Sequence, residues 1–148
     1  IVGEVCHFVD LCTYLVGETP QRVSAQALGR DPEIDDSVVA LLGFPDGSVA
    51  TIEYLAHASP RLPKERFEVS GAGRTADCEN FKLTRITGRS NLRTVNQDKG
   101  QAAAVGVVLE SVRANRPSPF SLEEIRGVSR TTFAILEAIR RRREIELE

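Results

Sequence analysis

The spacing of apolar residues changes twice along this chain, and this change limits the possible folds more than any other feature. From Glu4 to Val16, and again in two segments after residue 104, apolar residues recur at steps of three and four, which is typical of amphipathic helices. Between residues 21 and 96, short runs alternate between apolar and polar side chains, which indicates strands. A helix, then many strands, then two helices predict an α+β fold.

The middle of the chain is expected to form a sheet of short strands. The strand-like runs are separated by brief loops, which favours antiparallel neighbours. Pro45-Asp46-Gly47 lies between the second and third runs and predicts a hairpin turn. We therefore expect an open, mostly antiparallel β-sheet with about three helices packed on one face. The expected strands are 21–28, 36–44, 48–57, 65–70, 75–79, 82–87 and 91–96.

The helix ends carry their own sequence patterns. Gly17 is expected to stop the first helix. Ser121 with Glu124 three residues later predicts a capping box at the start of the last helix. The run Arg140 to Arg143 lies where the negative end of that helix dipole favours cations, so a solvated helix end is a simpler interpretation than a binding site.

Composition excludes several classes of function. With 148 residues, of which 41% are hydrophobic, the chain is long enough for one domain with a core and too short for two full ones. A net charge of −2 leaves no basic excess to attract phosphates, so nucleic-acid binding is not expected. No apolar run approaches the roughly 18 residues that a membrane span requires, and no secretory leader is expected. We expect a cytoplasmic protein that does not contact a membrane.

The three cysteines do not predict a metal site or a disulfide framework. Cys6, Cys12 and Cys78 are odd in number and lack C-x-x-C spacing. Reduced, mostly buried thiols and no bound metal are therefore expected.

A candidate catalytic pair lies on the first predicted helix. The spacing of three between His7 and Asp10 places both side chains on one helix face, away from the apolar stripe. A carboxylate beside an imidazole can fix its tautomer and raise its basicity, which suits a general acid or base in an alcohol/ketone interconversion. Many helices also carry such a pair at the surface without a catalytic role, and spacing alone does not decide between the two.

Two further motifs have a functional and a structural interpretation. The run Gly71 to Ala76 matches G-x-G-x-x-G/A, a dinucleotide-binding pattern. Residues 64–69 before it alternate between charged and apolar side chains, and no helical stripe follows it, so a turn between two strands is the stronger interpretation. His57, at the end of the third expected strand, is interpreted as an exposed loop residue rather than a ligand contact.

Taken in order, these segments resemble the second domain of the Gfo/Idh/MocA family of oxidoreductases. The resemblance begins with Gly3 to Leu11 and Tyr14 to Gly17 and covers almost the whole chain. It continues through the hairpin from Asp36 to Tyr54, Pro63 to Val69 with the Gly71 turn, Ser121 to Glu124, and Thr131 to Ile139.

The resemblance implies one half of a two-domain protein. Members of this family join an N-terminal Rossmann domain, which holds NAD or NADP, to an α+β domain that shapes the substrate site and often pairs subunits. Residues 1–148 are then a single C-terminal-type domain. Because the chain starts with Ile and has no Met, we expect a fragment whose Rossmann partner lies upstream. The fragment alone should bind no cofactor and be inactive. For the whole protein, the resemblance implies NAD or NADP as cofactor and a sugar, nucleotide sugar or polyol as substrate. It also implies a homo-oligomer formed through the sheet face.

The resemblance also assigns site residues. His7 matches the family histidine that handles the proton of the reacting hydroxyl, and Asp10 the acid three residues later. Many members carry an aspartate four residues before that histidine, where this chain has Gly3; the nearest acid, Glu4, is displaced by one position. Either Glu4 takes part of that role or the chemistry differs. A noncatalytic binding or oligomerisation module on the same fold is therefore the alternative.

Overall fold

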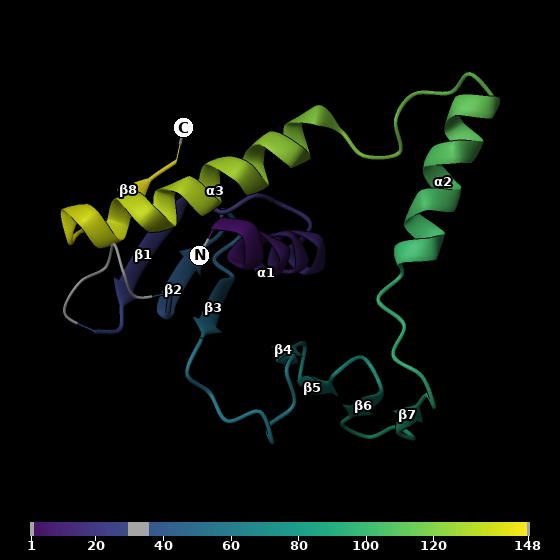
Figure 1. Ribbon diagram of the computed structural model, residues 1–148, viewed down its shortest axis with the longest axis horizontal. Coiled ribbons are helices and arrows are strands. Elements are labelled where there is room, and N and C mark those ends of the chain that lie inside the picture. The colour runs from purple at the N-terminus through teal and green to yellow at the C-terminus, as the bar shows by residue number, and fades with distance from the viewer. Residues whose placement is uncertain (1, 30–35, 148) are drawn as a thin grey trace. The chain divides into compact units, whose positions relative to one another are not determined.

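The computed structural model describes residues 2–29 and 36–147, which fall into two compact units. The first unit combines the described residues up to His57 with those from Phe120 onward, and the second comprises Ala58–Pro119. Figure 1 labels the helices and strands of both. The first unit contains α1 (Val2–Val16), β1 (Arg22–Ala27), β2 (Val38–Gly43), β3 (Val49–Tyr54), α3 (Leu122–Arg141) and β8 (Ile145–Glu146). The second contains β4 (Arg66–Gly71), β5 (Arg74–Glu79), β6 (Leu83–Ile86), β7 (Leu92–Arg93) and α2 (Gln101–Arg113).

The sheet of the first unit has four antiparallel strands in the order β3-β2-β1-β8. Along β2, Val38, Ala40 and Leu42 are buried. Val39 and Leu41 between them point to the other face and are exposed. This alternation is the period of two that places one side of a strand against a core.

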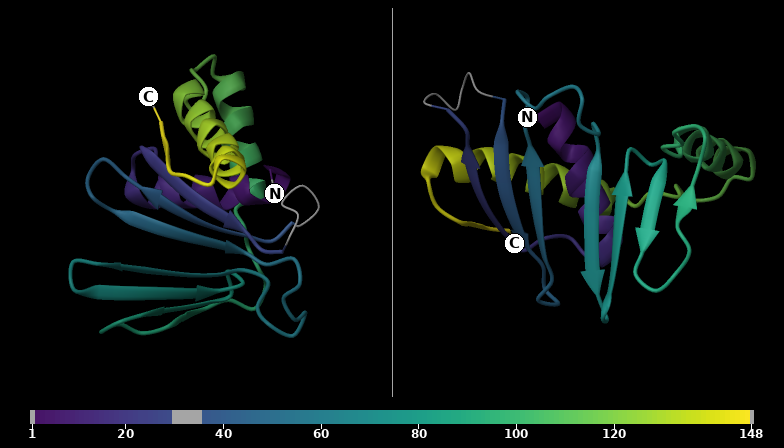
Figure 2. Two further views of the ribbon diagram at one scale, coloured as in Figure 1. Left: turned by 90° about the vertical axis from the view of Figure 1, so that its left-hand side faces the viewer. Right: turned by 90° about the horizontal axis from the view of Figure 1, so that it is seen from below.

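Helices α1 and α3 cover the buried face of this sheet (Figure 2). Val5 and Val9 from α1 and Ile135 from α3 are all 0% exposed and pack with the buried side chains of the strands. At full burial, each of these side chains contributes about 1.5–3 kcal/mol relative to an exposed one. The two ends of the described sequence thus build one core with the first three strands.

Local chemistry fixes the turns and helix ends of this unit. At the predicted hairpin, the Phe44 N–H donates to the Ser48 carbonyl (2.9 Å), Asp46 Oδ1 accepts from the Ser48 N–H (2.8 Å), and Gly47 has φ +88°. The predicted capping box is also present, with Ser121 Oγ accepting from the Glu124 N–H (3.0 Å) and Glu124 Oε2 from the Ser121 N–H (2.9 Å). The predictions of this turn and this cap are confirmed.

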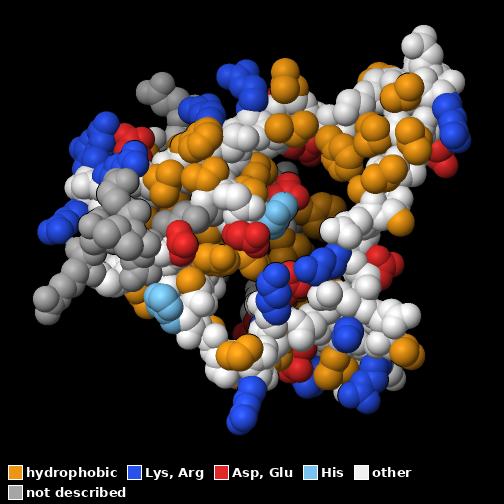
Figure 3. Space-filling view, viewed as in Figure 1, with side chains coloured by type: hydrophobic (Ala, Val, Ile, Leu, Met, Phe, Trp, Pro, Cys, Tyr) orange, Lys and Arg blue, Asp and Glu red, His pale blue; other side chains and the backbone are white. Residues whose placement is uncertain are grey.

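The second unit holds a sheet in the order β4-β5-β6-β7, also antiparallel. On one face, Arg85 bridges the carboxylates of Asp77 (2.6 Å) and Glu79 (2.8 Å). On the other, Cys78 is buried and aligned with Phe67, whose ring lies 5.6 Å from that of Phe81. Helix α2 follows this sheet, and hydrophobic side chains gather along it in Figure 3.

The α+β class, the three helices and the antiparallel pairing are confirmed. The strands, however, divide between two sheets where a single sheet was expected, and the last predicted run, 91–96, shrinks to Leu92–Arg93. The short strand β8 was not predicted. It forms because Arg142, with φ +53°, turns the chain after α3 and lets the Leu147 N–H donate to the Gln21 carbonyl (2.8 Å). No helix within 2–29 and 36–147 is long and apolar enough to cross a membrane.

Candidate functional site

The three predicted site residues form a stripe on the exposed side of α1. Glu4, His7 and Asp10 are all exposed, whereas Val5 and Val9 on the opposite side are completely buried. Because a helix turns about 100° per residue, positions three apart are offset by about 60° around its axis. His7 therefore lies between the two carboxylates on one surface, as the spacing predicts.

The stripe is available to a ligand. Among the described residues, no hydrogen bond or ion pair joins His7 to Asp10 or to Glu4, so the imidazole and both carboxylates keep their polar atoms free. Residues three apart on a helix are close enough to share one bound group. An imidazole can take or give a proton, and carboxylates beside it can accept hydrogen bonds from hydroxyl groups.

Gly3, where the resemblance described above implies an aspartate in many relatives, is not required by packing. A Cβ atom added to Gly3 would meet nothing within 4 Å, and Gly3 lies within α1 without a positive φ. An aspartate can therefore occupy this position without disturbing its neighbours. Packing therefore does not explain why this position holds glycine.

The glycine-rich run Gly71 to Ala76 is the turn of an antiparallel hairpin. Gly71 pairs with Arg74, and the two central residues have positive φ, +47° for Ala72 and +72° for Gly73. Positive φ at both central positions is the geometry of a type I′ turn, which suits tightly paired strands. The turn interpretation is confirmed. A dinucleotide loop needs a helix after the glycines, and here β5 follows, so this run does not fit that cofactor.

The other sequence candidates lie apart from the α1 stripe. His57 is exposed in the turn after β3, and Arg140 to Arg143 are exposed at the end of α3, where Arg141 pairs with Glu137 (2.7 Å). Both agree with the structural interpretations given above. All three cysteines are free thiols, and burial raises the pKa of Cys12. Within the part of the chain that the structure describes, no three His, Cys, Asp or Glu side chains gather as a metal site.

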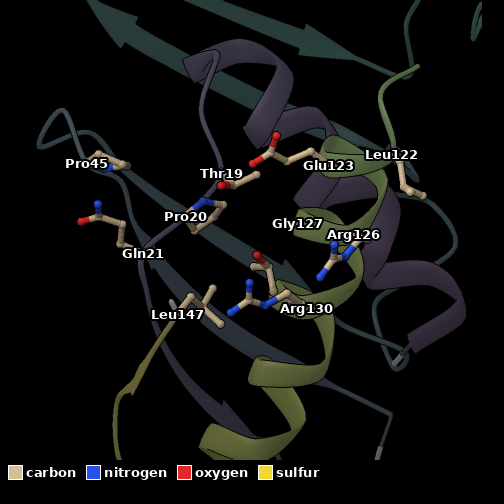
Figure 4. Close-up of a pocket in the computed structure, with 11 residues that line it drawn as sticks. Thr19, Pro20, Gln21, Pro45, Leu122, Glu123, Arg126, Gly127, Arg130 and Leu147 are labelled. Atoms are coloured by element: carbon tan, nitrogen blue, oxygen red, sulfur yellow. The ribbon is translucent and has the colours of Figure 1, made fainter. Parts of the chain in front are cut away.

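The sequence did not predict a pocket of about 640 Å³ in the first unit (Figure 4). It lies between the start of α3, the segment that follows α1, and the end of β8, and none of Glu4, His7 or Asp10 lines it. Its lining residues are Thr19, Pro20, Gln21, Pro45, Leu122, Glu123, Arg126, Gly127, Arg130, Thr131 and Leu147.

One sequence feature could have led to this pocket. Gly127 lies inside α3, where glycine costs about 1 kcal/mol relative to alanine. A Cβ atom at Gly127 would come within 2.4 Å of the Thr19 side chain. The glycine therefore lets the segment after α1 approach α3, and arginines 126 and 130 flank it along the helix.

A sequence profile described as the GFO/IDH/MocA C-terminal domain matches residues 3–76, which is half of the chain. The chain belongs to the Gfo/Idh/MocA family. The match starts at Gly3, so it includes the whole stripe of Glu4, His7 and Asp10 and three of the four strands of the sheet under α1, namely β1, β2 and β3. The resemblance deduced from the residues is thereby confirmed.

Solved structures share this Gfo/Idh/MocA fold. An aldose-aldose oxidoreductase from Caulobacter crescentus, complexed with glycerol, aligns with a TM-score of 0.76 and 21% identity, covering 96% of this chain and 45% of that one. A UDP-N-acetylglucosamine 3-dehydrogenase from Acidithiobacillus ferrooxidans gives 0.73 and 23%, covering 90% and 44%. An oxidoreductase from Agrobacterium radiobacter, in complex with NAD+, L-tartaric acid and magnesium, gives 0.77 and 13%, covering 97% and 47%.

This chain thus spans about half the length of each of these three proteins. At these identities the similarity shows the fold alone. No curated protein sequence gives a significant match.

Proposed function

We propose that this chain is the substrate-binding part of an NAD(P)-dependent oxidoreductase that acts on a sugar, a nucleotide sugar or another polyol. The observation that carries the proposal is the exposed stripe of Glu4, His7 and Asp10 within the segment matched to the family. The named activities of the similar structures support this substrate class, because two of them act on aldoses or on UDP-N-acetylglucosamine.

In this proposal, His7 handles the proton of the reacting hydroxyl. Oxidation of an alcohol to a ketone removes a hydride from carbon and a proton from oxygen, and a neutral imidazole nitrogen within hydrogen-bond reach can accept that proton. Asp10, about one turn further along α1, either orients the imidazole or accepts a hydrogen bond from another substrate hydroxyl. Glu4, on the opposite side of His7, would take the role of the acid that is missing at Gly3.

The hydride chemistry belongs to the nicotinamide cofactor. The Gly71–Arg74 turn does not fit a dinucleotide, so we assign cofactor binding to a Rossmann domain in the remainder of the parent protein. The bound NAD+ of the Agrobacterium radiobacter oxidoreductase supports this assignment. By itself, the present chain should neither bind NADH or NADPH at micromolar concentration nor turn over substrate, and calorimetric titration of both nucleotides tests this.

We further propose that the parent protein is a homo-oligomer that pairs through the outer face of the β3-β2-β1-β8 sheet. Val39, Leu41 and Val49 are exposed on this face at 36%, 46% and 64%. Large exposed apolar patches are often covered by a second subunit. Sedimentation should therefore show a dimer or a larger species, and a monomer at high concentration would contradict this part of the proposal.

Substitution of His7 in the full-length parent tests the catalytic assignment. His7→Ala should lower kcat by about a hundredfold or more, the range of general acid–base groups, while cofactor affinity stays the same. Asp10→Asn should have a smaller effect. If Asp10 orients His7, the pH profile of the rate should change; if Asp10 binds a substrate hydroxyl, the apparent KM should rise. Glu4→Gln tests the displaced acid, and Gly3→Asp tests whether the family acid raises activity.

Glu18→Gln is the matched control, because Glu18 is an exposed acid just beyond the end of α1. It should leave kcat and KM unchanged. If His7→Ala retains normal turnover with a verified substrate, the noncatalytic module replaces this proposal and the α1 stripe is only a surface pair.

A further inference from the structure

The pocket at the start of α3 contains two arginines that pair with no other residue in the described part of the chain. Arg126 and Arg130 are four residues apart, and both side chains leave α3 on the side that faces Pro20, Gln21 and Leu147 (Figure 4). Among the described residues, neither arginine takes part in a hydrogen bond or an ion pair. This distinguishes them from Arg141 on the same helix, which is paired with Glu137. Their guanidinium donors are therefore available to a molecule in the pocket.

The wall of the pocket also holds a buried hydroxyl that pairs with none of the described residues. Thr131 is 0% exposed, and its Oγ1 makes no hydrogen bond within 2–29 and 36–147. The next residue, Thr132, is nearly as buried but donates to the Val128 carbonyl (2.8 Å). An unpaired buried polar atom costs free energy, so unpaired buried groups in native proteins call for an explanation such as a bound water or ligand.

The remaining lining determines what kind of molecule fits. Pro20, Pro45, Leu122 and Leu147 offer apolar surface, and a volume of about 640 Å³ is typical of pockets that bind small molecules. The charged residues of the lining are Arg126, Arg130 and Glu123, which gives a net charge of +1 in a chain whose net charge is −2. Guanidinium groups bind phosphate and carboxylate through paired N–H donors.

Gly127 makes this arrangement possible. It lies between the two arginines, and its missing side chain allows Thr19 to approach α3. A larger residue at 127 would force the Thr19 side chain, which lines the pocket, to move. The pocket therefore depends on a helix position that is intrinsically unfavourable for helix stability.

We propose that this pocket binds a small organic anion through a phosphate or carboxylate group, with Arg126 and Arg130 on the anionic group and the apolar lining against the rest of the molecule. The site is separate from the α1 stripe, and binding there does not depend on the proposed reaction. It adds a ligand-binding function to the side of the first unit where α3 begins.

Amide chemical shifts of the chain in solution test the proposal. Inorganic phosphate and citrate are titrated separately at constant ionic strength, with sodium chloride as the reference salt. We expect saturable shifts of Thr19, Arg126, Gly127 and Arg130 with phosphate, with citrate, or with both. The more effective anion identifies the class of ligand. Shifts that do not saturate, or that chloride reproduces, would overturn the proposal.

Substitutions locate the binding. Arg126→Gln and Arg130→Gln should each weaken the affinity at least tenfold, and the lysine variants should be intermediate because lysine keeps the charge without the paired donors. Arg113→Gln removes the same charge from an exposed position on α2 and should change nothing. Because both pocket arginines are exposed, the variants should melt like the parent chain. Equal weakening by Arg113→Gln, or none by the pocket variants, would show nonspecific screening and reject the site.

Discussion

The two sheets of this protein have the same number of strands and the same antiparallel pairing, but they differ in how much they bury. Apart from Cys78, every buried apolar side chain of the described residues lies in the first unit. There, α1 and α3 lie across the β3-β2-β1-β8 sheet and complete a core. In the second unit, the side chains of β6 are half-buried, and valines 105, 107, 108 and 112 of α2 are exposed.

Strand pairing and core formation are therefore separate contributions to the fold. Backbone hydrogen bonds join the strands of both sheets, but a hydrogen bond contributes only about 0.5–1.5 kcal/mol net, because the unfolded chain bonds to water instead. Burial of apolar surface supplies most of the stability. The first unit should therefore resist unfolding more than the second.

The largest effect should come from truncating the core of the first unit. Leu42→Ala removes a side chain that is 0% exposed and should lower the free energy of unfolding by about 3 kcal/mol, through lost burial and a residual cavity. Leu92→Ala in β7, where the leucine is 62% exposed, should cost less than about 1 kcal/mol. Urea denaturation measures both. Similar losses would show that the second sheet is buried as deeply in solution as the first.

A smaller effect should follow from removing the cap of α3, the helix that covers the first sheet. Ser121→Ala deletes the hydroxyl that accepts from the Glu124 N–H and should cost about 1 kcal/mol. Thermal melting measures the loss. Ser129→Ala, on the same helix but outside the cap, serves as the control.

The same cap predicts a dependence on pH. Hydrogen bonds from the Ser121 side chain and backbone lower the pKa of Glu124 in the folded protein. The stabilisation is therefore complete above about pH 5, where the carboxyl is ionised in both states, and is lost as pH falls through the lowered pKa. The gap between the melting temperatures of the parent and of Ser121→Ala should narrow in acid, because the bond from Ser121 Oγ to the Glu124 carboxylate weakens while the bond from the Glu124 N–H to Ser121 Oγ does not titrate. A constant gap across this range would contradict the assigned cause.

A modest gain in stability should follow from Thr13→Val in α1. Thr13 is 8% exposed, and its hydroxyl makes no hydrogen bond within the described residues, so an isosteric valine should raise the free energy of unfolding by about 1 kcal/mol. Thr132→Val is the matched opposite, because it removes a hydroxyl that donates to the Val128 carbonyl, and it should destabilise. If both changes destabilise, a partner for the Thr13 hydroxyl exists in solution.

The smallest effect should come from the second sheet. Arg85→Gln removes both ion pairs of Arg85 with Asp77 and Glu79, yet pairs that are only half-buried contribute little because water still screens the charges. We expect a melting temperature within about one degree of the parent, measured at low and high salt. A large fall that salt abolishes would mean that charge, rather than burial, holds the second sheet together.

Much of this fold could be predicted from local pattern alone. The helical period located α1 and α3, Gly17 ended α1, and the residues of the β2–β3 turn and of the α3 cap act through neighbours a few positions away. The same period predicted that Glu4, His7 and Asp10 share an exposed surface.

The rest depends on contacts between distant segments, which a local pattern does not record. Alternation identifies a strand but not its neighbour, so the division into two sheets was not predicted. Strand β8 has only two residues, and it is a strand because β1 lies beside it. The pocket around Arg126 and Arg130 combines side chains from four separate parts of the sequence, and only Gly127 hinted at it.

The turn at Gly71 to Ala76 has a consequence for the reading of sequence motifs. In this hairpin, glycine suits Gly73 because the backbone there has positive φ. In dinucleotide loops, glycine is needed for a different reason, namely a tight turn and the close approach of the backbone to the pyrophosphate. The motif therefore indicates backbone dihedral angles and does not indicate a ligand. The residues that distinguish a hairpin turn from a dinucleotide loop precede the motif, where Arg66 and Glu68 alternate with Phe67 and Val69. A motif search that scores this flanking period would reject such hairpins without any structure.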